Sequence, residues 1–381
     1  MKSIGIVAEY NPFHNGHLYQ IQKIKELYPD YTIVVVMTGN FTERGDVAIL
    51  DKFKRTEIAL NNDVDLVVEL PYPFSTQSAD TFAYGAITIL EKLNVEKVVF
   101  GSESDNIEDL KTIAKTQINN SDFEKLVKIY SKFGNNYPTA ISNAVYDLTN
   151  KKVITPNDLL GVSYIKTIIE NNYKIEPISI KRIDNYHDKT LSNTFSSASS
   201  IREALKRNES IENHVPQNSL KYFDNLHFIE DYFDIIKYKI LTDNNLSKYC
   251  TVDEGIDCLL KKVINKSNTY EELIKNIKSK RYTYNKITRM ILHILCNFTK
   301  DKKDLFKDIS YIRILGFNDQ GKSYLNKIKK DIDVPIISKI TRNKDKMLEF
   351  ELETTSIYNL KGNKCIEENK IIYKGDKNDK E

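Results

Sequence analysis

The chain has 381 residues, 40% of them hydrophobic, and 56 Lys and Arg against 53 Asp and Glu leave a net charge of only +3. This length suffices for a full hydrophobic core and predicts two domains. No apolar stretch approaches the roughly 20 residues of a membrane span, and four unpatterned cysteines indicate free thiols rather than a disulfide framework. Because the first residues lead directly into a predicted strand rather than an export signal, we expect a cytoplasmic protein.

The first predicted elements are an apolar strand, Ser3–Ala8, and a helix whose apolar residues recur at helical spacing from Leu18. His14-Asn15-Gly16-His17 occupies the turn between them. A helix N-terminus offers free N–H groups and the positive end of the helix dipole, and Gly16 leaves room for an anion. With two imidazoles, this turn is suited to a triphosphate. A helix cap and a zinc site remain alternatives, although the other histidines are scattered and no cysteine pair accompanies them.

Strands and helices alternate over roughly the first two hundred residues, which predicts an α/β fold with a doubly wound parallel sheet covered on both faces. Ligands of such sheets bind beyond the carboxyl ends of the strands, where the Thr38-Gly39-Asn40 and Gly101-Ser102-Glu103 turns lie. The predicted strands after the first are Thr32–Met37, Leu66–Leu70, Lys97–Phe100 and Ile175–Ile183, and the predicted helices include Phe53–Asn61, Thr81–Leu93, Ile107–Thr116 and Pro156–Glu170.

A second candidate phosphate site opens the last helix of this part, at Ser196–Arg202. Serine hydroxyls and backbone N–H groups at a helix start bind phosphate oxygens, and Arg202 can add a bidentate contact. An N-cap with additional serines is the structural alternative.

The pattern changes after Arg207. A polar stretch, Asn208–Asn218, is predicted to be a linker, and the part that follows is predicted to be a mostly helical α+β domain, so we expect domains at 1–207 and 208–381. This second part is predicted to contain helices in Ser219–Phe298, strands at Tyr311–Phe317 and Val334–Ile337, and a basic helix at Gly321–Lys330.

Charge is distributed unevenly between these parts. Between Lys261 and Phe350 there are 22 Lys and Arg against 10 Asp and Glu, a local charge of +12 that leaves −9 for the rest of the chain. Such asymmetry predicts a polyanionic partner, most simply a nucleic acid, for the second half. A lysine-rich solvated surface is the alternative. The last residues, 375–381, are expected to be disordered.

The His-x-Gly-His turn together with the Ser-x-Ser-x-Ile-Arg sequence of 197–202 resembles the nucleotidyltransferase superfamily. Four further stretches resemble, more closely, the bacterial tRNA(Met) cytidine acetate ligase family: 5–17, 37–41, 44–46 and 69–71. Asn15 stands where the wider superfamily usually has a hydrophobic residue, a departure that the ligase family shares.

The resemblance implies that the chain uses ATP to convert acetate to acetyl-adenylate, without acetyl-coenzyme A. Transfer to N4 of the wobble cytidine in elongator tRNA(Met) would follow. By position it implies that ATP contacts Val7, Ala8, Glu9, Tyr10, Asn11, Pro12, Phe13, His14, Asn15, Gly16, His17, Leu18, Tyr19, Gln20, Gly101, Asn157 and Arg182. The last three also have structural alternatives: a turn glycine, a helix cap and a solvated edge charge.

Four residues are assigned catalytic roles, because positioned donors and cations supply most of the catalysis in phosphoryl transfer. His14 and His17 are assigned to the α- and β-phosphates, and Ser199 and Arg202 to the β- and γ-phosphates. Mg²⁺ is expected to bridge phosphates without a protein cage. Acetate is assigned to Thr38, Gly39 and Asn40, and Lys52 and Arg55 either neutralise charge or lie at the surface.

Two other functions share these motifs. A small-molecule adenylyl- or cytidylyltransferase would not explain the long basic second half. A non-catalytic nucleotide-sensing RNA-binding protein would not need the intact set of His14, Gly16, His17, Ser199 and Arg202. No membrane and no obligate protein partner is expected.

Overall fold

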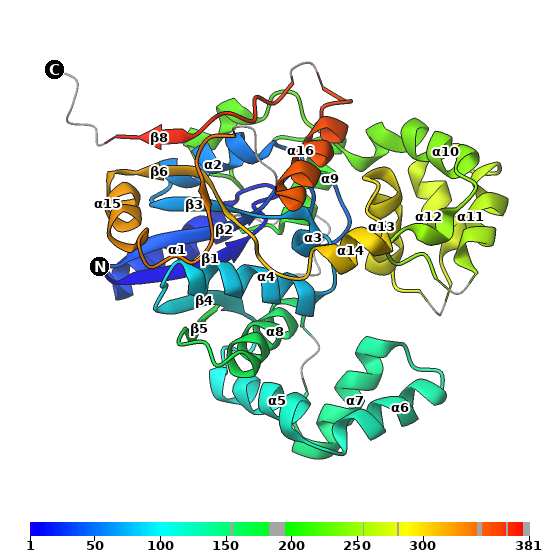
Figure 1. Cartoon of the computed structure of the whole chain (residues 1–381), viewed down its shortest axis with the longest axis horizontal. Coiled ribbons are helices and arrows are strands. Elements are labelled where there is room, and N and C mark those ends of the chain that lie inside the picture. Colours follow the sequence, from blue (N-terminus) through cyan, green and yellow to red (C-terminus); the bar gives the residue numbers. More distant parts are fainter. Residues whose placement is uncertain are drawn as a thin grey trace.

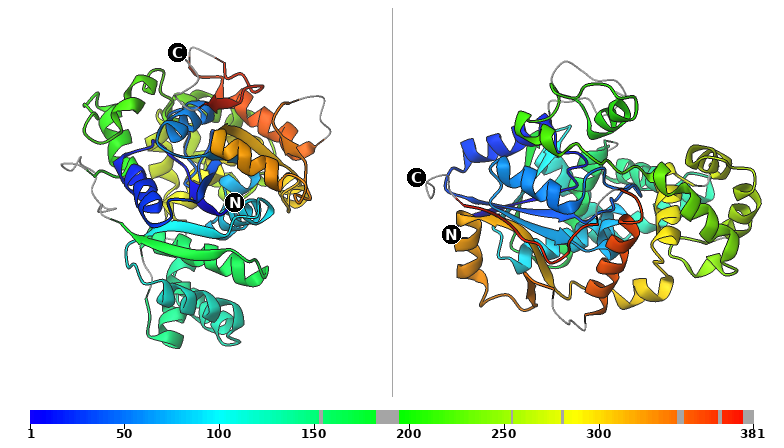
Figure 2. Two further views of the ribbon diagram at one scale, coloured as in Figure 1. Left: turned by 90° about the vertical axis from the view of Figure 1, so that its left-hand side faces the viewer. Right: turned by 90° about the horizontal axis from the view of Figure 1, so that it is seen from above.

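The computed structural model describes residues 1–152, 155–182, 195–253, 255–279, 282–340, 345–362 and 365–375. These residues form one sheet with helices on both faces (Figures 1 and 2). Its strand order is β5-β4-β1-β2-β3-β6-β7, with β8 beside β6. The strands are β1 (Ser3–Ala8), β2 (Thr32–Thr38), β3 (Leu66–Leu70), β4 (Lys97–Ser102), β5 (Glu176–Lys181), β6 (Ile312–Asn318), β7 (Ile336–Ile337) and β8 (Ile372–Lys374).

The first five strands confirm the doubly wound prediction. They are parallel, and the chain builds outward from β1 in one direction through β2 and β3 and in the other through β4 and β5. The order reverses between β1 and β4, which is where such sheets bind nucleotides. Beyond these strands the sheet is mixed, because β6 pairs antiparallel with β3.

Side chains alternate between the two faces of the sheet along β2, and different helices cover the two faces. The odd-numbered apolar residues of β2, such as Val35, pack with α1 and α2, whereas its even-numbered ones, such as Val34, pack with α4 and α8. The helices are α1 (Asn15–Leu27), α2 (Lys52–Asn61), α3 (Tyr72–Ser75), α4 (Ala79–Lys92), α5 (Ile107–Asn119), α6 (Phe123–Lys132), α7 (Tyr137–Thr149), α8 (Pro156–Glu170), α9 (Ala198–Lys206), α10 (Phe233–Thr242), α11 (Ile256–Ile264), α12 (Tyr270–Ile277), α13 (Tyr284–Leu295), α14 (Lys300–Leu305), α15 (Asp319–Ile328) and α16 (Lys346–Tyr358).

Helices α10–α14 form a module beyond the carboxyl ends of the strands, and α5–α7 form a separate group beside α8 (Figure 1). The prediction of a helical region in Ser219–Phe298 is therefore confirmed. No helix in the described part of the chain is long and apolar enough to cross a bilayer.

The predicted linker, Asn208–Asn218, packs against α9 through part of its length, while its other residues are exposed. Ile211 and Val215 are buried against Ile201 and Ala204 of α9, so the segment is packed although most of its residues are polar. The predicted strands at 311–317 and 334–337 do form, as β6 and β7, but they extend the main sheet rather than a second one. The division at residue 207 therefore stays a proposal about roles, not about separate sheets. Ile183 and residues 376–381, which also carried predictions, lie outside the described residues.

Candidate active site

The turn between β1 and α1 holds His14 and His17 face to face. Their rings stack with centroids 3.8 Å apart, and Tyr10 and Phe13 pack against His17 at 4.9 and 5.6 Å. The Nδ1 of His14 accepts the backbone N–H of Gly16 at 3.0 Å. The Nδ1 of His17 accepts the backbone N–H of His14 at 3.2 Å. A neutral imidazole whose Nδ1 is an acceptor carries its proton on Nε2. Both rings are therefore fixed as Nε2–H donors.

Electrostatics keeps His17 in this neutral form. Burial chiefly, with further contributions from His14 and Arg182, lowers the pKa of His17 well below its usual range. A neutral donor can bind phosphate oxygens without titrating near pH 7. The influence of Arg182 also shows that this residue, at the end of β5, lies near the histidine pair.

The expectation of free backbone donors at the start of α1 is wrong. The N–H of Asn15 donates to the carbonyl of His214, at 3.0 Å, and that of His17 to the carbonyl of His14, at 2.9 Å. The Gly16 N–H is taken by the His14 ring. The imidazoles, rather than the peptide groups, are the donors at this helix end.

The start of α9 does offer peptide donors. Ser197 caps the helix by accepting the N–H of Ser200 at 3.2 Å. Within the described part of the chain, the N–H groups of Ala198 and Ser199 donate to no acceptor. Because such groups with the helix dipole bind anions, this end of α9 fits a phosphate.

Arg202 joins the two motifs. Its guanidinium donates to the carbonyl of Asn11 at 2.7 Å and to the Ser199 hydroxyl at 3.4 Å. Its Nε lies 3.6 Å from a carboxylate oxygen of Asp46, a residue that sequence reasoning did not place in the site. The sequence signal for Asp46 was present in the Arg44-Gly45-Asp46 stretch of the family resemblance.

The remaining predicted ATP residues lie around the point where the strand order reverses. Val7 and Ala8 end β1, and Leu18, Tyr19 and Gln20 lie on α1. The β1–β4 ladder pairs only Ile4 with Lys97 and Gly5 with Val98, so β4 is unpaired with β1 further on. Gly101 lies there, and a Cβ on it would be 3.1 Å from the Arg182 side chain. The structure thus places Gly101 beside Arg182.

Asn157 lies at the same end of the sheet, on the second position of α8 rather than at its cap, which is Thr155. Its amide donates to Glu103 at 2.6 Å, just after β4. This contact ties the start of α8 to the β4 end and leaves the ATP role of Asn157 a prediction.

Lys52 and Arg55 are buried, so the surface alternative for them is wrong. Arg55 donates to three backbone carbonyls, those of Glu9, at 2.6 Å, Leu50, at 2.9 Å, and Gly39. It therefore ties the β1 end to the β2 end. Lys52 instead pairs with carboxylates below the Gly39 turn.

These carboxylates belong to a buried charge cluster of five residues: Lys52, Glu69, Arg313, Glu351 and Glu368. Lys52 contacts Glu69 at 2.8 Å and Glu368 at 3.0 Å. Burial, followed by the Glu69 charge, raises the pKa of Glu351 to about 8. With Glu351 protonated, the cluster holds two cations and two anions and is neutral.

The cluster weighs against part of the predicted acetate site. A Cβ on Gly39 would be 2.8 Å from Glu351 and 3.0 Å from Glu69, so a carboxylate there would face acidic side chains. The Asn40 side chain already bonds the Lys52 N–H and the Thr355 hydroxyl, at 3.0 and 3.3 Å. The Thr38 hydroxyl is buried without a hydrogen-bond partner among the described residues. The acetate assignment stays a prediction.

Glu351→Gln tests the charge state of the cluster. The folded protein keeps a proton that the unfolded chain releases above about pH 4.5, so this group costs the parent stability as pH rises toward 8. Glutamine removes that cost. We expect the free energy of unfolding of the variant, measured in urea, to rise relative to that of the parent between pH 5 and 8. The difference should be about 1 kcal/mol or more at pH 8. Parallel pH profiles would mean that Glu351 is ionised in the fold.

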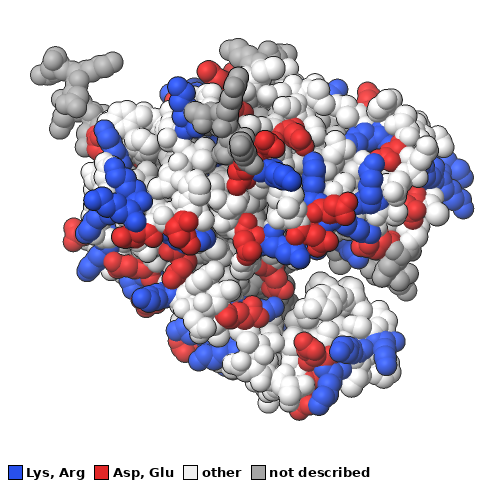
Figure 3. Space-filling model, viewed as in Figure 1, with Lys and Arg blue, Asp and Glu red and all other residues white. Residues whose placement is uncertain are grey.

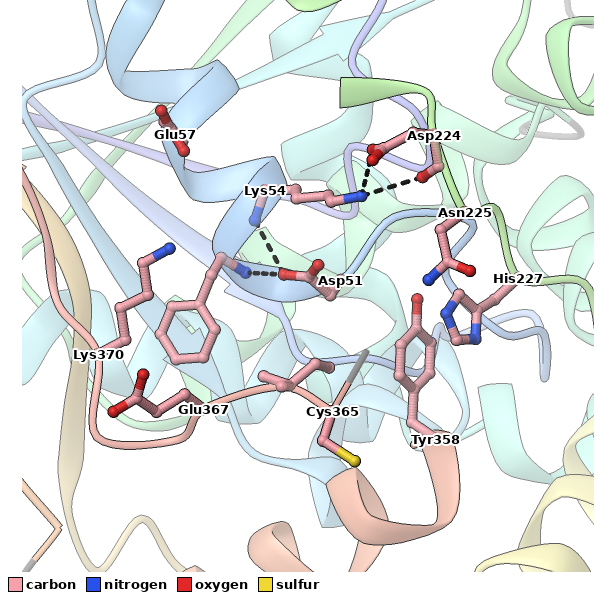
Figure 4. A pocket seen from close by; sticks show the side chains of 12 residues that line it. Asp51, Lys54, Glu57, Asp224, Asn225, His227, Tyr358, Cys365, Glu367 and Lys370 are labelled. Carbon is pink, nitrogen blue, oxygen red and sulfur yellow. Dashed lines mark hydrogen bonds and ion pairs between the residues drawn. The ribbon is translucent and has the colours of Figure 1, made fainter. Parts of the chain in front are cut away.

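A cavity of about 450 Å³ opens beside the start of α2, but it is not the predicted site. Among the residues that line it, Lys54 pairs with Asp224 at 2.6 Å, and the rings of His227 and Tyr358 stack on each other (Figure 4). None of the predicted ATP or acetate residues lines it. No group of three or more His, Cys, Asp or Glu among the described residues could hold a metal ion.

Comparisons with known proteins agree with this geometry. A model of the HIGH Nucleotidyl Transferase family matches residues 1–371. The chain is 40% identical to the tRNA(Met) cytidine acetate ligase of Geobacillus sp. strain WCH70, over 90% of each chain. It is 40% identical to the protein of that name from Caldicellulosiruptor saccharolyticus, over 95% of this chain and 94% of the relative.

Solved structures show the same likeness. Thermotoga maritima TmcAL without ligand superposes with a TM-score of 0.89 at 30% identity, covering 94% of this chain and 95% of that one. The form of the same protein bound to alpha-thio ATP gives a TM-score of 0.83 at 30% identity, covering 94% and 92%.

Proposed function

The chain belongs to the HIGH nucleotidyl transferase family and, within it, to the tRNA(Met) cytidine acetate ligases, and from this membership we propose that it acetylates the wobble cytidine of elongator tRNA(Met) with acetate and ATP. An acetate oxygen attacks the α-phosphorus and pyrophosphate leaves. N4 of cytidine then attacks the acyl carbon, and AMP leaves. The observation that carries this proposal is the contact from Arg202 to Asn11, which brings both phosphate motifs to one site.

We assign the roles from donor chemistry. The Nε2–H groups of His14 and His17 bind the α- and β-phosphates, where charge grows as the carboxylate attacks. Arg202, with Ser199 and the free N–H groups of α9, binds the β- and γ-phosphates. Mg²⁺, when bound together with ATP, would supply further charge neutralisation, and its ligands would come mainly from ATP and water.

The tRNA partner is supported by the basic surplus of the second half, with a qualification from the structure. On the face shown in Figure 3, acidic and basic side chains are interspersed. Some of the basic residues between 261 and 350 are also already paired, since Arg313 lies in the buried cluster and Lys302 contacts Glu353 at 3.0 Å. The RNA contacts must therefore lie at particular places on the second half rather than over its whole surface. A cytoplasmic location follows from such a substrate and stays part of the proposal.

Isotope exchange separates this function from its alternatives. The protein, incubated with ATP, acetate and labelled pyrophosphate but no RNA, should move label into ATP because adenylate formation is reversible. Exchange that ignores acetate, or acetylation that needs acetyl-coenzyme A, would contradict the proposal. A small-molecule nucleotidyltransferase would require a different acceptor, and a non-catalytic sensor would show no exchange.

A further inference from the structure

One part of the basic second half stands out by composition. The basic segment, residues 261–289, contains nine Lys or Arg and only two acidic residues. Lys262, Lys266, Lys275 and Lys278 are exposed and form no ion pair with any residue that the structure describes. Cations that are not already neutralised can bind phosphates and release counterions.

The segment ends on α13, which docks on the active site. Figure 1 shows α13 and α14 on the side of the module that faces the sheet. Arg289 pairs with Glu43 at 2.6 Å. Gly45, with φ of +76°, approaches α13 so closely that a Cβ on it would be 2.2 Å from the backbone nitrogen of Arg289. The next residue, Asp46, is the one beside Arg202. The middle of α13 thus lies against the turn that contains a neighbour of a proposed phosphate ligand, Arg202.

The first turn of α13 carries an exposed aromatic ring, that of Tyr284. Tyr284 is the first residue of α13 and is 54% exposed. It lies one turn before Thr288, on the same side of the helix, and the Thr288 hydroxyl donates to the Arg44 carbonyl. Burial first, and then the charges of Asp46 in the 42–46 turn and of Glu230 in η2 (Ile229–Tyr232), raise the pKa of Tyr284.

We propose that Tyr284 is a stacking site for a nucleobase of the single-stranded RNA loop that carries the acceptor cytidine, with Lys262, Lys266, Lys275 and Lys278 binding phosphates of the same RNA. Bases of a loop are unstacked easily, and an exposed ring binds any of them through its face. Stacking beside Arg202 would bring a neighbouring cytidine toward the acyl-adenylate. This inference rests on the proposed function and names the surface that receives its RNA.

The chain provides a matched control. Like Tyr284, Tyr137 is the first residue of a helix, in this case α7, and it is 65% exposed. It belongs to the α5–α7 group, which Figures 1 and 2 place apart from α13. The variants are Tyr284→Ala, Tyr284→Phe and Tyr137→Ala in the full chain, each checked by thermal melting. The readouts are the Kd for a tRNA(Met) transcript at fixed ionic strength and the ratio of acetyl transfer to pyrophosphate exchange.

Loss of one stacked base weakens binding by roughly 5- to 150-fold. We therefore expect Tyr284→Ala to raise the Kd and lower the ratio about 10-fold, with Tyr284→Phe and Tyr137→Ala close to the parent. Equal effects of Tyr284→Ala and Tyr137→Ala, or no effect of either, would overturn the inference. Should the parent show no acetate-dependent exchange, the proposed function fails, whereas the Kd comparison still decides whether Tyr284 binds RNA.

Discussion

The His17→Ala variant should exchange pyrophosphate into ATP about 100-fold more slowly than the parent, the usual scale for losing a donor that acts in the transition state. The structure gives the reason. His17 is held neutral and presents Nε2–H because its Nδ1 accepts the N–H of His14. Alanine removes that donor at the point where charge accumulates on the phosphate oxygens.

A second variant separates this role from capping. In His17→Gln the side-chain oxygen can still accept the His14 N–H, as Gln does at this position of a capping box. Its melting temperature should therefore stay close to that of the parent, while exchange stays low because the donor is displaced. Near-normal exchange in folded His17→Ala would assign His17 to capping α1 alone.

The elements nearest the site could be predicted because their signals are local. The bounds of β1 and α8 agree with the sequence prediction, since an apolar run and a Pro-initiated helical period are read within one segment. The place of β6 could not be predicted in this way. Its residues show a strand, but nothing near them shows that the partner is β3, about 250 residues earlier, and that the pairing is antiparallel.

The fold brings the two predicted phosphate motifs together, but the sequence did not show which of their N–H groups remain available as donors. Sequence reasoning counted free N–H groups at the start of α1, yet the acceptor for Asn15 is the His214 carbonyl, from a stretch predicted to be a linker. Two buried side chains, Ile211 and Val215, dock that stretch, and two apolar residues in a polar segment are a weak signal. Which N–H groups remain free depends on such distant contacts.

Charged side chains were the least predictable part. Lys52 follows a candidate turn and was equally compatible with substrate binding and with solvent. Its partners, Glu69 and Glu368, lie 17 and 316 positions further along the chain, and only the fold brings them together. The same packing places acidic groups beside Gly39, a feature that no local pattern indicates.

A tRNA(Met) transcript in which uridine replaces the wobble cytidine should accept no acetyl group, while pyrophosphate exchange continues at the parent rate. The N4 amine of cytidine is a poor nucleophile because its lone pair is delocalised into the ring, so transfer requires an acyl group activated as a mixed anhydride with AMP. Uridine has a carbonyl oxygen at that position and no amine. Exchange needs only ATP and acetate and is therefore independent of the base.

A transcript with uridine in place of a cytidine outside the anticodon is the matched control and should be acetylated normally. In cells, mass mapping of tRNA(Met) from a strain that lacks the gene should show the loss of one acetyl group at the wobble position. Acetylation of the uridine transcript, or N4-acetylcytidine retained at that position in a strain with no second acetylating enzyme, would show that the acceptor is another group. In that case the nucleotide next to the base that stacks on Tyr284 would present a different nucleophile to the same adenylate, because the two phosphate motifs and the exchange reaction do not depend on the acceptor.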